Sequence, residues 1–210
     1  MNLLITAFEP FGGRDVNASL RVLEKLNFSR FAELKITTAV LPVRHQTAAS
    51  ILVALIDQWL PDVTICMGEA GGRPQISLER VAINYADYRI HDNGGVQVSD
   101  EMLVNDAPSA YFSSLPLRKS EQRIKAAGIP VEISLSAGSY LCNEVFFHLM
   151  HKLASCNENK LGGFIHLPYL PQEVVATDTN AASMAEELTT EGVSIVIEEC
   201  AALLRDNARM

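Results

Sequence analysis

Short apolar runs alternate along the chain with longer segments in which apolar residues recur every three or four positions. Short runs that contain β-branched residues are typical of strands buried on both faces. The first of them ends firmly at the turn Glu9–Gly13. The runs predict strands at Asn2–Ala7, Ile36–Leu41, Val63–Met67, Leu78–Tyr85, Val131–Leu135 and Gly163–Leu167.

The longer segments have helical spacing, and each lies between two predicted strands or after the last one. Strands that alternate with helices indicate layered α/β architecture. We therefore expect a three-layer α/β/α sandwich with a mixed, largely parallel central sheet. No repeat or linker interrupts the pattern, which predicts one domain over residues 1–210. The predicted helices are Ala18–Leu26, Gln46–Leu60, Leu115–Ala127, Cys142–Leu153 and about Asn180–Leu204.

Composition narrows the possible partners. Lys and Arg total 17 against 25 Asp and Glu, a formal charge of -8. Phosphate binding depends on clustered basic residues, so we expect no nucleic-acid partner. No apolar stretch approaches the ~20 residues of a membrane helix, and the N-terminus reads as a strand rather than a signal peptide. The four cysteines form no CxxC pair, so we expect reduced thiols in the cytoplasm and no zinc site.

Ligands of open α/β sheets bind outside the carboxyl ends of the strands. Four segments follow predicted strands directly: Phe8–Gly13, Gly68–Arg73, Ser136–Asn143 and His166–Tyr169. The glycine-rich Gly68–Arg73 segment invites comparison with a phosphate-binding loop. It lacks both the Lys-Ser/Thr pair and the GxGxxG spacing, so a tight turn is the better interpretation.

Cys142 stands where a small-residue turn leads into a predicted helix. Unpaired N–H groups and the helix dipole favour a thiolate in a first turn, and those N–H groups could also hold an oxyanion. A buried structural cysteine is an equally good interpretation of the position alone. The sequence pattern leaves this choice open.

A cysteine nucleophile needs a base and a group that orients it. Among five histidines, His166 ends a predicted strand at the expected crevice, whereas His148 and His151 lie further along the helix of Cys142. Glu79 is a charged residue entering an apolar strand. On the residues alone, a salt bridge with Arg80 or another surface cation is the favoured role for Glu79.

Several motifs, taken in order along nearly the whole chain, resemble the pyroglutamyl-peptidase I (pyrrolidone-carboxylate peptidase) family of cysteine peptidases. They are Thr6–Gly13, Gly71–Arg73, Glu79–Asn84, Arg89–Asn93, Ser136–Asn143 and Gly163–Tyr169. This resemblance implies an enzyme that removes N-terminal pyroglutamate from peptides, with no metal or organic cofactor. It also implies a homodimer or homotetramer.

The resemblance further implies roles for single residues. The Cys-His-Glu triad falls on Cys142, His166 and Glu79, and Arg89 is expected to give electrostatic support near the oxyanion. The residues expected to bind the substrate ring are Phe8, Phe11, Asn17, Glu69 and Tyr140.

Two residues near the expected ring site depart from the family pattern. Glu69 stands where relatives often have Gln, and Val43 where some have Thr. Two alternative functions therefore stay open: another small-amide thiol amidase on the same scaffold, and a non-catalytic binding protein that kept the pocket.

Overall fold

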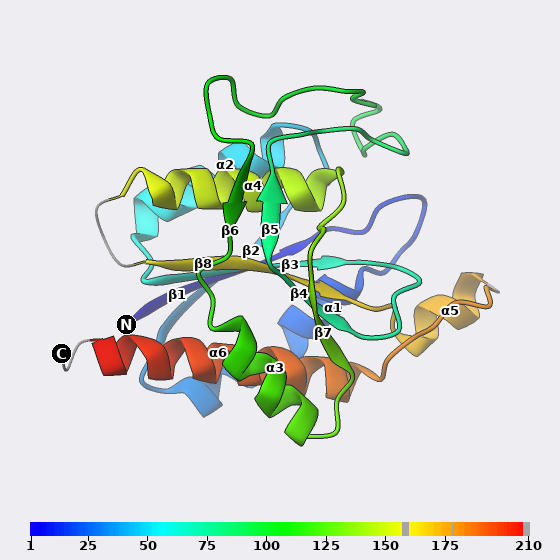
Figure 1. Cartoon of the computed structure of the whole chain (residues 1–210). Coiled ribbons are helices and arrows are strands. Elements are labelled where there is room, and N and C mark those ends of the chain that lie inside the picture. Colours follow the sequence, from blue (N-terminus) through cyan, green and yellow to red (C-terminus); the bar gives the residue numbers. More distant parts are fainter. Residues whose placement is uncertain (157–159, 178, 208–210) are drawn as a thin grey trace.

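A central mixed sheet organises the computed structural model, which describes residues 1–156, 160–177 and 179–207 (Figure 1). Within those residues the sheet has six strands in the order β2-β1-β3-β8-β4-β7. Strands β2, β1, β3 and β8 are parallel, while β4 is antiparallel to β8 and parallel to β7. The mixed, largely parallel sheet is confirmed. The strand bounds are β1 Asn2–Phe8, β2 Lys35–Leu41, β3 Val63–Glu69, β4 Ile76–Glu79, β7 Val131–Ser134 and β8 Leu161–Leu167.

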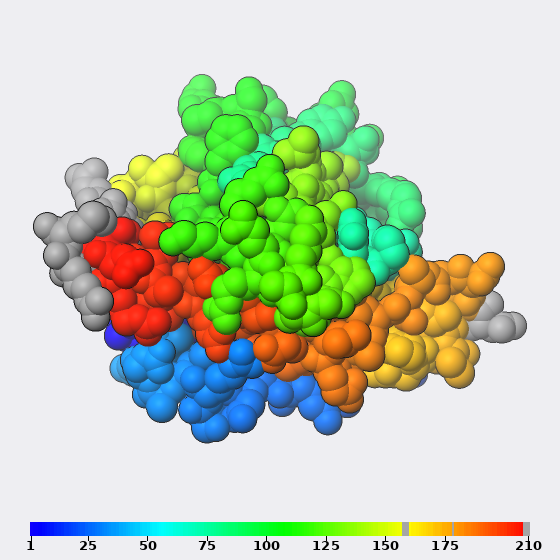
Figure 2. Space-filling model, turned by 60° about the horizontal axis from the view of Figure 1, so that its bottom comes forward, coloured from blue at the N-terminus to red at the C-terminus, as the bar shows by residue number. Residues whose placement is uncertain are grey.

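Helices cover both faces of this sheet, as the three-layer prediction required. Helices α2 (Thr47–Trp59) and α4 (Leu141–Ala154) pack together on one face (Figure 1). On the other face, α6 (Glu186–Asn207) packs against both α1 (Ala18–Lys25) and α3 (Leu117–Ala126). Figure 2 shows α6, in orange to red, crossing that surface between the blue N-terminal segment and green α3.

Alternate residues of the strands belong to two separate hydrophobic cores, because successive side chains of a strand point to opposite faces of the sheet. Ile5, Ile65 and Ile165 belong to the core under α1, α3 and α6. Cys66 and Phe164 belong to the core under α2 and α4. Apolar residues on both faces explain why the strands read as continuous apolar runs.

The predicted strand Leu78–Tyr85 is wrong as a single element. Its first part belongs to β4, and its second part forms β5 (Val81–Ile83), which pairs with β6 (Ala110–Phe112) outside the main sheet. Arg80 is the junction, since its N–H donates to Ser134 and its carbonyl accepts from Ser113. Both parts are largely buried, so an apolar run could not show where one strand ends and the next begins.

Elements near the C-terminal end also differ from the prediction. The expected helix from about Asn180 begins only at Glu186, because Met184 N–H bonds the carbonyl of Tyr169 and keeps the preceding segment extended. The sequence analysis missed β6, the 3-10 helix Phe28–Phe31 and helix α5 (Pro171–Thr177). A proline at the first helical position was the available signal for α5. None of the helices in the described part of the chain is long and apolar enough to cross a membrane.

Candidate active site

A histidine and a glutamate meet on the face of the sheet covered by α4. In the antiparallel pairing of β4 with β8, Ser77 lies opposite His166, so Glu79 is the diagonal neighbour on the same face. His166 Nδ1 lies 2.7 Å from Glu79 Oε1, and both side chains are buried. Strand register therefore produces this contact between residues 87 positions apart.

Arg73 also contacts Glu79, and the sequence analysis gave Arg73 no role. Its Nη1 donates to Glu79 Oε1 at 2.7 Å, and its Nη2 donates to the carbonyl of Ser136 at 2.9 Å. Burial raises the pKa of Glu79, but the hydrogen bond and charge of His166, with support from Ser134 and Arg73, lower it overall. Of the favoured salt bridge with Arg80 or another surface cation, the bridge that forms is to Arg73, and the Glu79 carboxylate in it is buried and also contacts His166.

His166 is held ready to accept a proton. Burial lowers its pKa, although Glu79 acts in the opposite direction, so the imidazole is neutral at neutral pH. Because ionised Glu79 can only accept, Nδ1 carries the proton and donates it to Glu79. Nε2 of His166 is then the free basic nitrogen.

Cys142 is the second residue of α4 and lies against the middle of the sheet. A Cβ atom built on Gly68 would be 2.8 Å from Cys142 Sγ, and Gly68 is aligned with His166 in the β3–β8 pairing. Burial, then Glu79 and Glu69, raise the pKa of the Cys142 thiol, while Arg73 lowers it. The resting group is therefore a thiol, even though the helix position alone favours a thiolate.

Cys142 and His166 line the same cavity. Arg73 and Arg89 also line it. Arg89 is exposed and reaches the cavity from the loop after β5, which places a cation at the solvent side of the cavity. Arg14 lines the cavity as well, and of these three arginines Arg73 is the one hydrogen-bonded to the histidine–glutamate pair.

An apolar recess beside Cys142 contains every residue predicted to bind the substrate ring. The recess is lined by Phe8, Phe11, Asn17, Val43, Glu69, Tyr140, Leu141 and Cys142. Phe11 and Tyr140 face each other with ring centroids 6.4 Å apart. The amide of Asn17 is already engaged: Nδ2 donates to the Glu9 carbonyl, and Oδ1 accepts from Ser19 N–H as the N-cap of α1. Asn17 thus shapes the recess by fixing the start of α1.

The turn after β3 explains the glycines that invited a phosphate-loop comparison. A Cβ on Gly71 would lie 1.9 Å from the Tyr169 ring, and Gly72 has a φ of +87°. The first glycine makes room for an aromatic ring and the second supplies a left-handed backbone. The tight-turn interpretation accounts for both.

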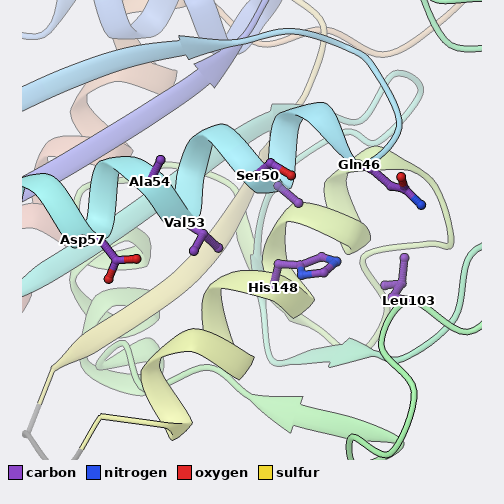
Figure 3. Close-up of a pocket in the computed structure, with 8 residues that line it drawn as sticks. Gln46, Ser50, Val53, Ala54, Asp57, Leu103 and His148 are labelled. Carbon is purple, nitrogen blue, oxygen red and sulfur yellow. The ribbon is translucent and has the colours of Figure 1, made fainter.

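A second cavity lies between α2 and α4, away from this site (Figure 3). His148 points into it, opposite Ser50 and Asp57 of α2, and no cysteine lines it. His151 is bonded instead to Tyr111. Among the described histidines that line the cavity of Cys142, His166 is the one present, which makes it the base candidate. Across the described residues, no group of three or more His, Cys, Asp or Glu side chains could hold a metal ion.

Comparison with known proteins places this geometry in a family. The family model described as "Pyroglutamyl peptidase" matches residues 1–203. The chain belongs to the pyroglutamyl peptidase family. Family membership confirms both the resemblance seen in the motifs and the prediction of an enzyme that acts on peptides.

Relatives within the pyroglutamyl peptidase family match over almost their whole length. The pyrrolidone-carboxylate peptidase of Bacillus cereus (strain Q1) is 38% identical over 196 residues, covering 93% of this chain and 91% of the relative. That of Pyrococcus furiosus is 39% identical, covering 94% and 97%. A mutant pyrrolidone carboxyl peptidase from the same hyperthermophile superposes with a TM-score of 0.93 at 38% identity, covering 97% of this chain and 100% of that one.

Proposed function

We propose that this chain is a cysteine exopeptidase that hydrolyses the amide bond after an N-terminal pyroglutamyl residue. The observation that carries the proposal is the convergence of Cys142, His166 and Glu79 beside an apolar recess of the kind a small lactam ring would fill. The names of the relatives support the substrate.

The first half of the reaction forms a thioester. His166 Nε2 takes the thiol proton as Cys142 Sγ attacks the pyroglutamyl carbonyl carbon. Backbone N–H groups in the first turn of α4 stabilise the oxyanion, with Arg89 at the rim of the cavity. His166 then gives its proton to the leaving amine, and the C–N bond breaks. Glu79 keeps the imidazole in the productive tautomer and stabilises the imidazolium that forms in between.

The second half releases the product. His166 removes a proton from water, and the water oxygen attacks the thioester carbonyl. The C–S bond breaks, the sulfur regains its proton from His166, and free pyroglutamate leaves. His166 rests as a neutral imidazole and is neutral again at the end of each half. The proton of the Cys142 thiol leaves with the amine in the first half and is replaced by a proton from water in the second.

The recess also supports exopeptidase action. No residue precedes a pyroglutamyl ring in the substrate. The pocket that binds the ring beside Cys142 can therefore be closed at its far end. Phe8 and Phe11 on one side and Tyr140 on the other suit a flat, partly apolar ring, while Glu69 offers polar contact.

A second candidate function rests on Glu69. A carboxyl in the ring recess could favour a different small amide on the same scaffold, making the chain another thiol amidase. Relative turnover of pyroglutamyl, prolyl and glutaminyl amides separates the two candidates. The non-catalytic alternative is separated by the rate at which iodoacetamide alkylates Cys142.

Two further parts of the proposal concern the setting of the enzyme. All four cysteines are free, which supports a reducing compartment such as the cytoplasm. We also propose a homodimer or homotetramer, to be tested by analytical ultracentrifugation.

Turnover of a chromogenic pyroglutamyl amide tests the function. We expect the wild type to hydrolyse it at least about a thousandfold faster than Cys142→Ser, since loss of a nucleophile removes most of the rate enhancement. Prolyl and glutaminyl amides serve as controls and should not turn over. An inactive wild type, or full activity in Cys142→Ser, would refute the proposal.

A further inference from the structure

Glu69 is part of a buried acidic cluster behind the ring recess. Its side chain is only 2% exposed. Oε2 accepts a hydrogen bond from Ala18 N–H at 3.0 Å, and Oε1 accepts one from Arg14 Nη1 at 2.9 Å. The carboxyl lines both the recess and the wider cavity that contains Cys142.

A second buried carboxyl, Glu173 of α5, faces Glu69. Glu173 Oε2 accepts from Leu170 N–H at 2.7 Å, whereas Oε1 is buried and receives no hydrogen bond from any of the described residues. The side chains of Glu69 and Glu173 are within hydrogen-bonding reach of each other. Two carboxylate oxygens can bond only if a proton lies between them, so one proton satisfies the otherwise unpaired oxygen.

Charge balance leads to the same result. Arg14 is the cation paired with Glu69; its guanidinium also lies 4.3 Å from the centre of the Tyr169 ring and donates to the Tyr169 hydroxyl. Two buried carboxylates against one guanidinium would leave a net negative charge in a site shielded from water, which is costly. Two carboxyls that share one proton, together with Arg14, carry no net charge.

The other groups around Glu69 do not supply a second positive charge. Arg73 is bound to Glu79, and exposed Arg89 reaches only the rim of the cavity. Burial keeps Cys142 a neutral thiol and His166 a neutral imidazole. Burial first, and then the hydrogen bond and charge of Glu173, raise the pKa of Glu69 to about 8, against the lowering effects of Ala18 N–H and Arg14.

We propose that Glu69 and Glu173 share one proton and, with Arg14, form a neutral floor that makes the recess select an uncharged lactam ring over a cationic amine ring. This proposal rests on the proposed function, since it concerns the ring of that substrate. A neutral carboxyl at residue 69 has the shape and hydrogen-bonding capacity of a glutamine amide. It can donate to a lactam carbonyl as well as accept from a lactam N–H.

Loss of the shared proton reverses the preference. An apolar ring that closes over an unneutralised carboxylate strips water from it, which weakens lactam binding. The same negative charge attracts a ring that carries an ammonium group. Glu69 and Glu173 are therefore specificity-determining residues, acting through one proton.

Two matched ligands test the proposal. 2-Pyrrolidone is the bare lactam ring, and pyrrolidine is the same ring as a cation. Their dissociation constants are measured by NMR titration between pH 6.5 and 9.5 on Cys142→Ser, which removes titration of the thiol. For a group with a pKa of about 8, the Kd of 2-pyrrolidone should rise about tenfold between pH 7 and pH 9. The Kd of pyrrolidine should fall over the same range.

Two variants in the Cys142→Ser background test whether Glu69 and Glu173 cause the change of Kd with pH. Glu69→Gln replaces the protonated carboxyl by a neutral amide, and Glu173→Gln leaves Glu69 as a single carboxylate paired with Arg14. Each should abolish the alkaline rise in the Kd of 2-pyrrolidone, and either one alone is decisive if the other does not fold. Glu187→Gln, on the exposed side of α6, is the matched control and should keep the rise.

Three results would overturn the proposal: a Kd of 2-pyrrolidone that does not change with pH, an alkaline rise that persists in both variants, or tighter binding of pyrrolidine at pH 7. If wild type hydrolyses the pyroglutamyl amide while any of these holds, the shared proton is refuted and the proposed function stands. If wild type neither hydrolyses the amide nor binds 2-pyrrolidone, both are refuted.

Discussion

Arg73 joins three parts of the site, one of which lies 63 positions away in sequence. It spans from the turn after β3 to the carboxylate of Glu79 and to the Ser136 carbonyl in the loop that leads to Cys142. A guanidinium can make both bonds at once because its donors form a rigid fork. Arg73 therefore positions Glu79 of the proposed triad and the loop that leads to Cys142 together.

Arg73→Met should lower kcat by about tenfold to a hundredfold, the equivalent of about 1.5–3 kcal/mol for a lost hydrogen bond to a charged group. Since Arg73 helps to lower the pKa of Glu79, the variant should also shift the acid limb of the pH–rate profile, whereas a loss of folded protein would scale the whole profile equally. Steady-state kinetics from pH 4 to 8 measure both. Arg118→Met, at a side chain 73% exposed, is the control; equal kinetics for the two variants would contradict the assigned role.

Gly68 leaves the space that Cys142 Sγ occupies, because glycine has no Cβ. A Cβ there would lie 2.8 Å from both Cys142 Sγ and the ring of Phe164, so Gly68→Ala must displace one of them. We expect kcat to fall by about a hundredfold, because small misplacements of reacting groups are costly. KM should change little, since the ring recess is lined by other residues. Unaltered kcat in a folded variant would show that Sγ does not need this position.

At the scale of elements, helix α4 carries the proposed nucleophile, Cys142, and aromatic side chains pack α4 against the sheet. Phe146 of α4 is fully buried, and its ring centroid lies 6.0 Å from that of Phe164 in β8. Phe164 is in turn 4.9 Å from the ring of His166. Aromatic packing between α4 and the sheet thus extends to the ring of His166.

Phe146→Ala should lower the free energy of unfolding by about 3–5 kcal/mol, the usual cost of a large cavity in a core. Phe112→Ala, at a side chain 70% exposed, should change it by no more than about 0.5 kcal/mol. Urea titrations followed by circular dichroism compare the two variants. Similar losses at both positions would mean that α4 is not held by this contact.

Sequence pattern predicted some site residues from strand ends and could not place others. Glu69 and His166 fall at the carboxyl ends of parallel strands, where a ligand site is expected. Glu79 and Cys142 instead come from β4 and from the chain after β7, two strands that run the opposite way. Hydrophobic patterning carries no strand direction. The strand-end rule still selected the segment of Cys142, whereas only the family resemblance linked Glu79 to the site.

Across the whole molecule, the layer order was predictable and the interactions between layers were not. Apolar runs and helical spacing were enough for the α/β/α arrangement, and most element bounds agree within a few residues. The roles of Arg14 and of Arg73 depend on contacts that include residues 55 and 63 positions away, Glu69 and Ser136. The role of Glu173 depends on the burial of its side chain in a short helix. Those contacts follow from register and packing, which a single sequence does not display.

Folding stability of the whole chain should depend on the protonation of His166. Burial lowers its pKa below the ordinary value of 6.5, so the unfolded chain binds this proton first as the pH falls. The contribution of neutral His166 to the free energy of unfolding is fully present above about pH 6.5. Below that pH the contribution falls by at most about 1.4 kcal/mol per pH unit. His166→Gln should therefore show a shallower decline between pH 7.5 and 5.5 in urea titrations. Parallel curves for wild type and variant would contradict the assignment.

The most direct test of the account is the site of the acyl-enzyme. Wild-type protein is mixed with a pyroglutamyl amide, quenched in acid during turnover, digested and examined by mass spectrometry. The account predicts one pyroglutamyl group on the peptide that contains Cys142, and none on the peptides that contain Cys66, Cys156 or Cys200. Turnover with the group on another residue, or unimpaired turnover by Cys142→Ala, would contradict it.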